Sequence, residues 1–187
     1  GRVPTRWKVN RGERRMKKLL AIVAATAIAA PAMAVTLTQG TSEIGMAGTY
    51  DSDTNLGSDF DIAVKYGYFF WDNVAIGGAV GFADNDARSK YDLGAFAEYN
   101  FAMDGDWVPY LGLNLAWSET DPAAGEKNDA FVTTPNAGVK YFFSSSVAGF
   151  LQLNYDFASE DIYTDQDGNV EDSNLGFVLG LRVYLGQ

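Results

Sequence analysis

The sequence contains no cysteine and no histidine in its 187 residues. The missing cysteines exclude disulfides, thiolate metal sites and lipid attachment through a cysteine, and the missing histidines exclude a histidine-based triad or general base. Charged residues are also few, at 20%, whereas aromatic residues reach 14% and glycine occurs 20 times. This composition favours many short β-strands over amphipathic helices.

The charge is distributed unevenly along the chain. Residues 1–34 hold eight of the 14 basic residues and one acid, whereas from Val35 onward six basic residues stand against 23 acidic ones. The acidic part disfavours nucleic acid as a partner, because the phosphate backbone would repel it. The two parts are therefore interpreted separately.

Residues 16–34 have the three parts of a secretory signal peptide. A basic Met-Lys-Lys start precedes the apolar run LLAIVAATAIAA, and the segment ends on the small-x-small sequence AMA. The apolar run is too short for a membrane-spanning helix, which needs about 20 residues. We predict cleavage after Ala34 and a mature domain over 35–187. Residues 1–15 match no part of a signal, and we interpret them as an upstream, non-native extension before Met16.

The mature chain alternates apolar and other residues with a period of two. Eight segments follow this pattern, each with the length of a tilted membrane strand, about 9–11 residues. These segments cover 44–50, 60–68, 74–82, 91–101, 109–117, 131–143, 147–157 and 175–185. Short connections near 71–73, 102–106 and 144–146 alternate with long ones at 51–59, 83–90, 118–130 and 158–174. Such alternation is typical of barrels with periplasmic turns and extracellular loops.

Two architectures produce this alternation: a soluble lipocalin-like barrel or sandwich with its apolar face inside, and a membrane barrel with that face outside. The other face is rich in glycine and alanine and carries few charges, of both signs, which suits a narrow lumen better than a solvent face. Aromatic residues gather at both ends of the segments, as in the two girdles of a membrane barrel. We therefore predict an all-β fold, an eight-stranded antiparallel up-and-down transmembrane β-barrel, closed by pairing of the first and last strands.

Four runs of the chain resemble the small OmpA/OmpX-type outer-membrane β-barrel family in order and spacing: VPYLGLNLAW, PNAGVKYFF, VAGFLQLNYDF and LGFVLGLRVYL. The resemblance implies the outer membrane of a Gram-negative bacterium, insertion by the barrel-assembly machinery, and contact with outer-membrane lipid and lipopolysaccharide. It also implies roles in membrane integrity, adhesion or passive, porin-like permeability. Barrel enzymes of this membrane usually employ a catalytic histidine, so we expect no enzyme and no cofactor.

Eight charged residues fall on the face predicted to line the lumen. Because eight strands leave an interior just wide enough for side chains, we expect the lower charges to pair and plug it. This predicted lumen charge network comprises Glu43, Lys65, Glu98, Lys140 and Arg182. The predicted acidic extracellular mouth comprises Asp61, Asp92 and Asp156.

The sequence thus predicts a monomeric structural or surface barrel with a plugged lumen. The alternatives are a passive narrow channel for small cations or apolar solutes and a soluble secreted lipocalin-like binder. The acidic loops are interpreted as a solvated surface or as weak divalent-cation sites that bridge to lipopolysaccharide. The run DQDGN resembles the start of a calcium loop, but Val170 and Gly176 stand where Gly and Glu are needed. We expect a turn there and no specific metal site.

The interpretation of the N-terminal segment is testable by mass spectrometry. The exported protein should begin at Val35, because the small residues before it match a signal-peptidase site. The unprocessed precursor should begin at Met16. Peptides from residues 1–15 in that precursor, or a different mature N-terminus, would contradict these boundaries.

Overall fold

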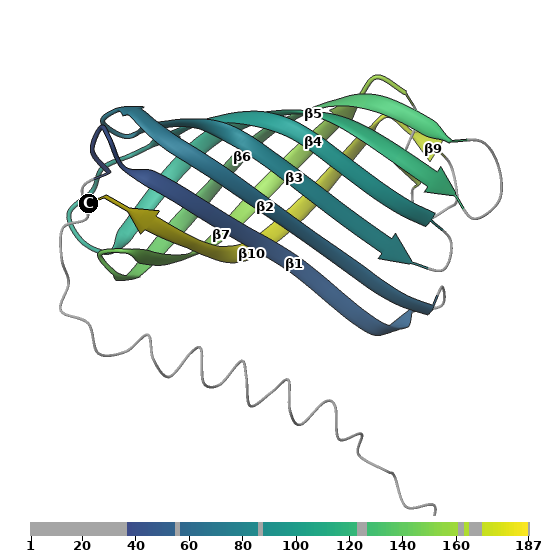
Figure 1. Ribbon diagram of the computed structural model, residues 1–187, viewed down its shortest axis with the longest axis horizontal. Helices are drawn as coiled ribbons and strands as arrows, with labels where there is room; N and C mark the ends of the chain where they lie inside the picture. Colours follow the sequence, from purple (N-terminus) through teal and green to yellow (C-terminus); the bar gives the residue numbers. More distant parts are fainter. Residues whose placement is uncertain are drawn as a thin grey trace, which may run out of the picture. The chain divides into compact units, whose positions relative to one another are not determined.

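The computed structural model describes residues 37–54, 57–85, 88–122, 127–160, 163–164 and 170–186. Eight long antiparallel strands form a closed barrel (Figure 1). They are β1 (Ser42–Thr54), β2 (Gly57–Trp71), β3 (Val74–Asn85), β4 (Arg88–Asn100), β5 (Trp107–Pro122), β6 (Asn128–Ser144), β7 (Val147–Ala158) and β10 (Ser173–Leu185). Two short strands, β8 (Tyr163–Thr164) and β9 (Val170–Glu171), pair separately between β7 and β10.

This topology confirms the predicted up-and-down barrel. Each long strand pairs with its sequence neighbours, and β1 pairs with β10 to close the sheet. None of the described segments is a helix long and apolar enough to cross a membrane. The predicted upstream extension and signal peptide lie outside the described residues.

The strands are longer than the apolar pattern predicted. β1 and β2 remain paired as far as Thr54 and Gly57, and β3 and β4 as far as Asn85 and Arg88. The predicted long connections at 51–59 and 83–90 were therefore wrong in their boundaries. The apolar alternation ends where the side chains become polar, but backbone pairing needs no apolar side chain and continues beyond that level.

The three short connections lie where the sequence predicted them. β2 and β3 are joined at Asp72 and Asn73, and Asn73 adopts a φ of 65°, which asparagine tolerates better than most residues. Gly105 supplies a φ of 109° between β4 and β5. Figure 1 shows these connections at the same end of the barrel as the C-terminal end of β10. We call this the turn end and the opposite end the loop end.

The outer surface of the barrel is apolar. Leu93, Phe177 and Leu179 are 68%, 74% and 71% exposed, respectively. Large exposed aromatic residues lie at both levels predicted for the girdles: Tyr66, Trp71, Tyr99, Phe101 and Trp107 toward the turn end, and Tyr91, Trp117, Phe131, Tyr155 and Phe157 toward the loop end. A continuous apolar surface of this kind is unfavourable in water and matches the hydrocarbon layer of a membrane.

The lumen at the turn end holds an apolar core that the sequence pattern did not predict. Its buried members are Leu37, Phe69, Ala75, Phe96, Val108, Phe142, Ala148 and Tyr184. The ring centroid of Tyr184 lies 5.1 Å from that of Phe142 and 6.4 Å from that of Phe69. The carbonyl of Leu37 accepts a hydrogen bond from the amide of Asn73, which holds the segment before β1 against the turn. The turn end is therefore filled by packed side chains.

Inward-facing glycines make room for inward-facing rings on the neighbouring strands. A Cβ added at Gly138 would lie 2.5 Å from the Tyr110 ring, and one at Gly180 would lie 2.6 Å from the Phe150 ring. At Gly77 an added Cβ would lie 1.9 Å from the carbonyl oxygen of Tyr66. The glycine-rich inner face is thus the counterpart of a few large inward side chains.

The neighbouring glycines Gly77 and Gly78 provide a matched test. Gly77→Ala should lower the free energy of unfolding by about 1–3 kcal/mol, because the added methyl group overpacks a fixed backbone. Gly78→Ala should have little effect, since its nearest neighbour, the carbonyl oxygen of Gly94, would lie 3.7 Å away. Urea unfolding of the refolded protein in detergent measures both, and equal effects would contradict the account.

Candidate functional site

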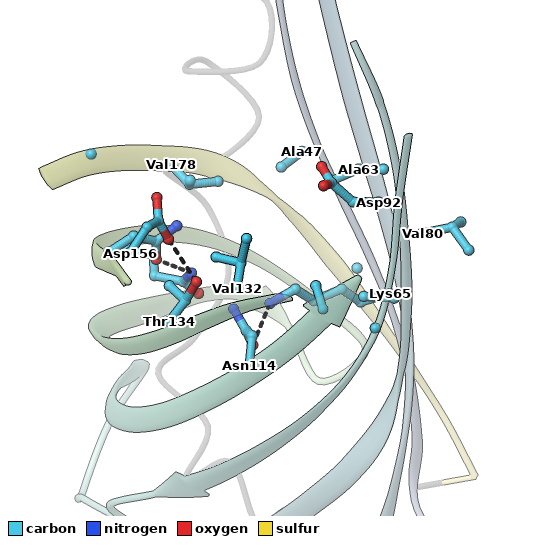
Figure 2. Close-up of a pocket in the computed structure, with 18 of the residues that line it drawn as sticks. Ala47, Ala63, Lys65, Val80, Asp92, Asn114, Val132, Thr134, Asp156 and Val178 are labelled. Atoms are coloured by element: carbon cyan, nitrogen blue, oxygen red, sulfur yellow. Dashed lines mark hydrogen bonds between the residues drawn. The ribbon is translucent and has the colours of Figure 1, made fainter. Parts of the chain in front are cut away.

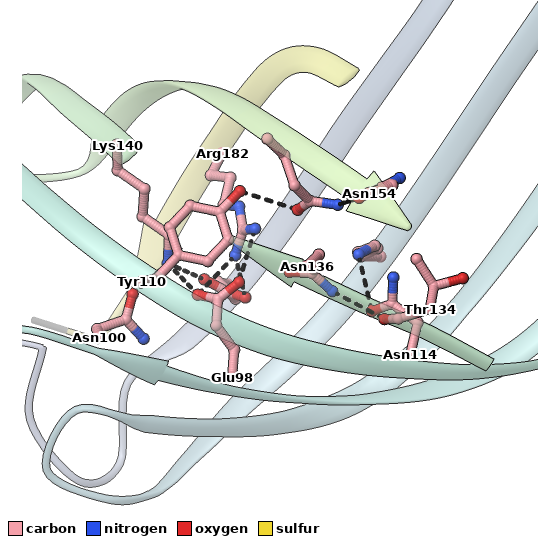
Figure 3. A network of polar contacts seen from close by, with 12 residues as sticks. Glu98, Asn100, Tyr110, Asn114, Thr134, Asn136, Lys140, Asn154 and Arg182 are labelled. Carbon is pink, nitrogen blue, oxygen red and sulfur yellow. Dashed lines mark hydrogen bonds and ion pairs between the residues drawn. The ribbon is translucent and has the colours of Figure 1, made fainter. Parts of the chain in front are cut away.

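Four charged side chains from four strands meet inside the barrel (Figure 3). Arg182 on β10 donates from Nη1 to Glu43 Oε1 on β1 at 2.8 Å, and from Nη2 to Glu98 Oε2 on β4 at 2.8 Å. Lys140 on β6 bonds to Glu98 and lies 3.6 Å from Glu43 Oε2. We call Glu43, Glu98, Lys140 and Arg182 the lumen charge cluster.

The lumen charge cluster is buried and electrically balanced. All four residues are 4% exposed or less. Two carboxylates face two cations, so each buried charge has partners of opposite sign. A balanced pair adds little net stability, but removing one member leaves an uncompensated buried charge at a cost of about 3–5 kcal/mol.

Aromatic rings and amides surround the cluster, and these residues were not in the predicted network. Tyr110 lies 5.0 Å from both Lys140 Nζ and Arg182 Cζ, measured to the ring centroid. Phe150 lies 4.8 Å from Arg182 Cζ on the same measure. The Oδ1 atom of Asn100 accepts a hydrogen bond from Lys140 at 2.6 Å. Cation–π contacts and this amide supplement the ion pairs.

A signal for these partners exists in the sequence. Asn100 follows Glu98 by two residues on the same strand and therefore shares its inward face. Tyr110 and Phe150 stand out because they are aromatic residues on the polar side of the alternation. The apolar pattern selects the opposite register at these positions, so it assigns no role to an aromatic residue that points inward.

Lys65 was predicted in the network, but it makes no ion pair with the four residues of the lumen charge cluster. Its Nζ donates to Asn114 Oδ1 at 3.3 Å and lies 5.2 Å from the Phe96 ring centroid. Its separation explains how the cluster balances, because five members would leave one excess cation. Lys65 instead lines the space above the cluster.

A cavity of about 410 Å³ occupies the lumen on the loop side of the cluster (Figure 2). The three residues predicted to form the acidic mouth, Asp61, Asp92 and Asp156, all line it, together with Lys65 and Lys90. Asp92 pairs with Lys90 at 3.1 Å, and Asp156 accepts a hydrogen bond from Thr134 at 2.6 Å. The space therefore presents charges of both signs and is not purely acidic.

At the loop end, Lys127, just before β6, forms ion pairs with two carboxylates of β5. Its Nζ lies 3.1 Å from both Asp121 and Glu119. Hydrogen bonds to Asp121 and Glu119 raise the pKa of the Lys127 ammonium above its ordinary value. All three side chains remain exposed to solvent, so the contact orders the end of the β5–β6 hairpin and adds little stability.

The described residues contain no ready-made cluster of metal ligands. Within the ranges that the structure describes, no group of three acidic side chains is placed to hold a metal ion. The calcium-like run at 165–169 lies outside them. The arrangement in the lumen can fill and close a narrow interior, and it can present mixed charge to a small polar group from the loop side.

Comparison with solved structures agrees with the barrel. The N-terminal β-barrel domain of OprF from Pseudomonas aeruginosa is 18% identical with a TM-score of 0.57, covering 79% of this chain and 98% of that one. Neisserial surface protein A is 19% identical with a TM-score of 0.54, covering 82% and 99%, respectively. OprG from Pseudomonas aeruginosa is 13% identical with a TM-score of 0.55, covering 80% and 98%. At these identities the likeness concerns the fold alone.

The family assignment comes from the sequence itself. No curated protein matches the chain in a sequence search. The family model described as "Outer membrane protein beta-barrel domain" matches residues 20–186, which is most of the chain. The closed barrel and its apolar outer surface agree with that description, and this chain belongs to the outer membrane protein beta-barrel domain family.

Proposed function

We propose that this chain is a non-conducting structural barrel of a Gram-negative outer membrane, with a surface role in membrane integrity, adhesion or interaction. The observation that carries the proposal is the lumen charge cluster, whose four members are buried and paired across the barrel. A barrel that conducted through its centre would need water where these side chains lie. We further propose that the protein is a non-catalytic monomer, exported through the secretory pathway and inserted by the barrel-assembly machinery.

Two successive barriers support a closed lumen. An ion that entered from the loop end would first meet the cluster, where Arg182 and Lys140 are already neutralised by two carboxylates. It would next meet the apolar core at the turn end, which includes Phe69, Phe142 and Leu37. Transfer of an unpaired charge through such a core is strongly unfavourable. Opening the cluster alone therefore would not give a wide pore.

One observation favours the alternative of a narrow cation channel. The cavity above the cluster is lined by Asp61, Asp92 and Asp156, which would attract cations from outside. The same cavity contains Lys65 and Lys90, and its floor includes Arg182. This mixed charge gives cations no continuous attractive path, so we place the channel second.

The partners follow from the outer surface. The apolar wall contacts lipid, and the polar loop end faces lipopolysaccharide and the exterior. Acidic residues at the loop end, such as Glu160 and Asp172, border a polar hollow with Lys127 and Asp129. We propose that divalent cations bind weakly there and bridge to lipopolysaccharide phosphates, which is the second of the two interpretations that the acidic loops left open.

Planar-bilayer conductance tests the closed lumen. The refolded mature protein should be silent. Arg182→Ala and Lys140→Ala should show small leak currents but no steady open-pore steps, because each leaves a void and an unpaired carboxylate at the cluster while the apolar core at the turn end stays in place. Lys127→Ala is the matched control, since it removes a lysine that pairs only at the loop end. Steady cation-selective steps from the unaltered protein would refute the plug and favour the channel.

Charge balance and side-chain volume can be separated by a second set of variants. Lys140→Met keeps most of the side-chain volume but leaves two carboxylates against Arg182 alone. It should therefore lower the free energy of unfolding by about 3–5 kcal/mol. Adding Glu98→Gln restores one charge of each sign and should recover most of that loss. Urea unfolding in detergent measures both, and a double variant no more stable than Lys140→Met would contradict the role of balance.

A further inference from the structure

The barrel wall is incomplete at one seam. In the described part of the chain, pairs between β1 and β10 run from Ser42–Leu185 to Ala47–Gly180 and stop there. Both strands continue beyond this point toward the loop end. β1 stays paired with β2 as far as Thr54, and β10 stays paired with β7 as far as Ser173. Each strand therefore has one neighbour along this stretch, and the edges facing the seam are left without a ladder.

The open part of the seam lies at the depth of the membrane. Phe177 on β10 pairs with Leu153 on β7, and Leu175 pairs with Tyr155. Tyr155 belongs to the aromatic girdle at the loop end, so Phe177 and Leu179 lie on the membrane side of that girdle. Unpaired backbone groups at this depth lack water and need another hydrogen-bond partner.

The barrel wall has a second interruption, between β6 and β7, across which the two strands remain joined. Between β6 and β7 the ladder omits Pro135, which has no amide hydrogen, and resumes at Asn136–Asn154. There the hydrogen bond from Thr134 to Asp156 joins the two strands. The pairing also continues on the far side, at Thr133–Phe157. The β1–β10 gap differs because no further β1–β10 pair follows it among the described residues.

The two sides of the open seam have opposite chemistry. The lumen cavity reaches the seam, since Ala47 of β1 and Asn174, Gly176 and Val178 of β10 line it. Its other walls carry Lys65 and Lys90 together with the three aspartates of the predicted mouth. On the membrane side stand Phe177 and Leu179, two of the most exposed apolar side chains of the described residues. The seam thus lies between a polar cavity that carries charges of both signs and the hydrocarbon layer of the membrane.

We propose that the seam is a lateral binding site for a single-chain zwitterionic amphiphile. Its headgroup would occupy the cavity, where both signs of charge are present and the exposed strand edges offer hydrogen bonds. Its hydrocarbon tail would pass between β1 and β10 and lie along Phe177 and Leu179 in the membrane. Neither a free headgroup nor a hydrocarbon alone satisfies both sides.

This site is closed toward the turn end and is therefore different from a channel. Its floor is formed by Arg182 of the lumen charge cluster, below which the apolar core fills the barrel. A bound amphiphile enters from the membrane or the exterior and leaves by the same side. The proposal goes beyond the closed structural barrel, and it holds whether or not rare ions leak through the plug.

Backbone NMR on the full mature barrel in phosphatidylcholine nanodiscs provides the test. Added lysophosphatidylcholine should shift the amides of Gly48 and Gly176 saturably, while those of Gly77 and Gly112, which do not line the cavity, stay unchanged as controls. Phosphocholine or dodecane alone should need at least tenfold higher concentration. Seam amides that neither shift saturably on addition nor differ between nanodiscs and amphipol would overturn the proposal, and so would equal shifts at the control glycines.

A pair of variants tests the membrane flank. Phe177→Ser should weaken lysophosphatidylcholine binding at least tenfold, because it removes an apolar contact beside the seam. Leu93→Ser is the matched control, since Leu93 is similarly exposed but lies on β4, away from the seam. Equal weakening by both variants would reduce the effect to general membrane contact and overturn the site.

Two further arms identify the occupant. If the seam shifts are present in nanodiscs before addition and vanish in amphipol, the occupant is supplied by the membrane; if they appear only on addition, it comes from outside. Shifts that depend on protein concentration without added amphiphile would assign the seam to strand pairing between two copies, and this result would overturn the proposal. Conductance of the unaltered protein, measured separately, tests the plug independently of the seam.

Discussion

The narrowness of an eight-stranded barrel is the constraint on which the rest of this structure depends. Its interior is just wide enough for side chains, so each inward residue must suit its inward-facing neighbours. A ring such as Tyr110 or Phe150 therefore lies over the glycine paired with it on the adjacent strand, Gly138 or Gly180, which leaves it space. Charges obey the same rule, and a cation without an opposed carboxylate would be buried alone. The lumen charge cluster therefore fills the interior as the packed rings do, with charge pairing as an added requirement.

The same constraint explains how much of the molecule the sequence could predict. The fold follows from a period-two pattern, because any strand facing lipid must be apolar on alternate residues. The charge positions follow too, since Glu43, Glu98 and Arg182 are rare charges on the opposite face. What the pattern could not supply was distance across the lumen. Strand stagger decides which inward residues share a level, and it places Lys65 within hydrogen-bond distance of Asn114, on the cavity side of the cluster.

The remaining differences have one physical source. Apolar alternation reports where lipid is, and it reports nothing about what fills the interior or where backbone pairing ends. Phe69 and Phe142 thus look anomalous in sequence, although they form the core of the turn end. For the same reason the strands continue past the apolar band, as Thr54 and Gly57 show. A pattern set by contact with lipid cannot specify side-chain contacts inside the barrel, because lipid does not reach them.

The plug and the seam share one wall of the barrel and place opposite demands on it. From the turn end toward the loop end, Gly180 is the last residue of β10 that pairs with β1. Arg182, which lies two residues nearer the turn end, belongs to the lumen charge cluster. Below Gly180 the ion pairs to Glu43 and Glu98 draw β10 toward β1 and β4, which favours a closed ladder. Above it, no cross-lumen contact of comparable strength acts on β10 among the described residues, and the strand follows β7 alone. The β1–β10 ladder therefore ends close to the level of the charge cluster, and the polar cavity begins there.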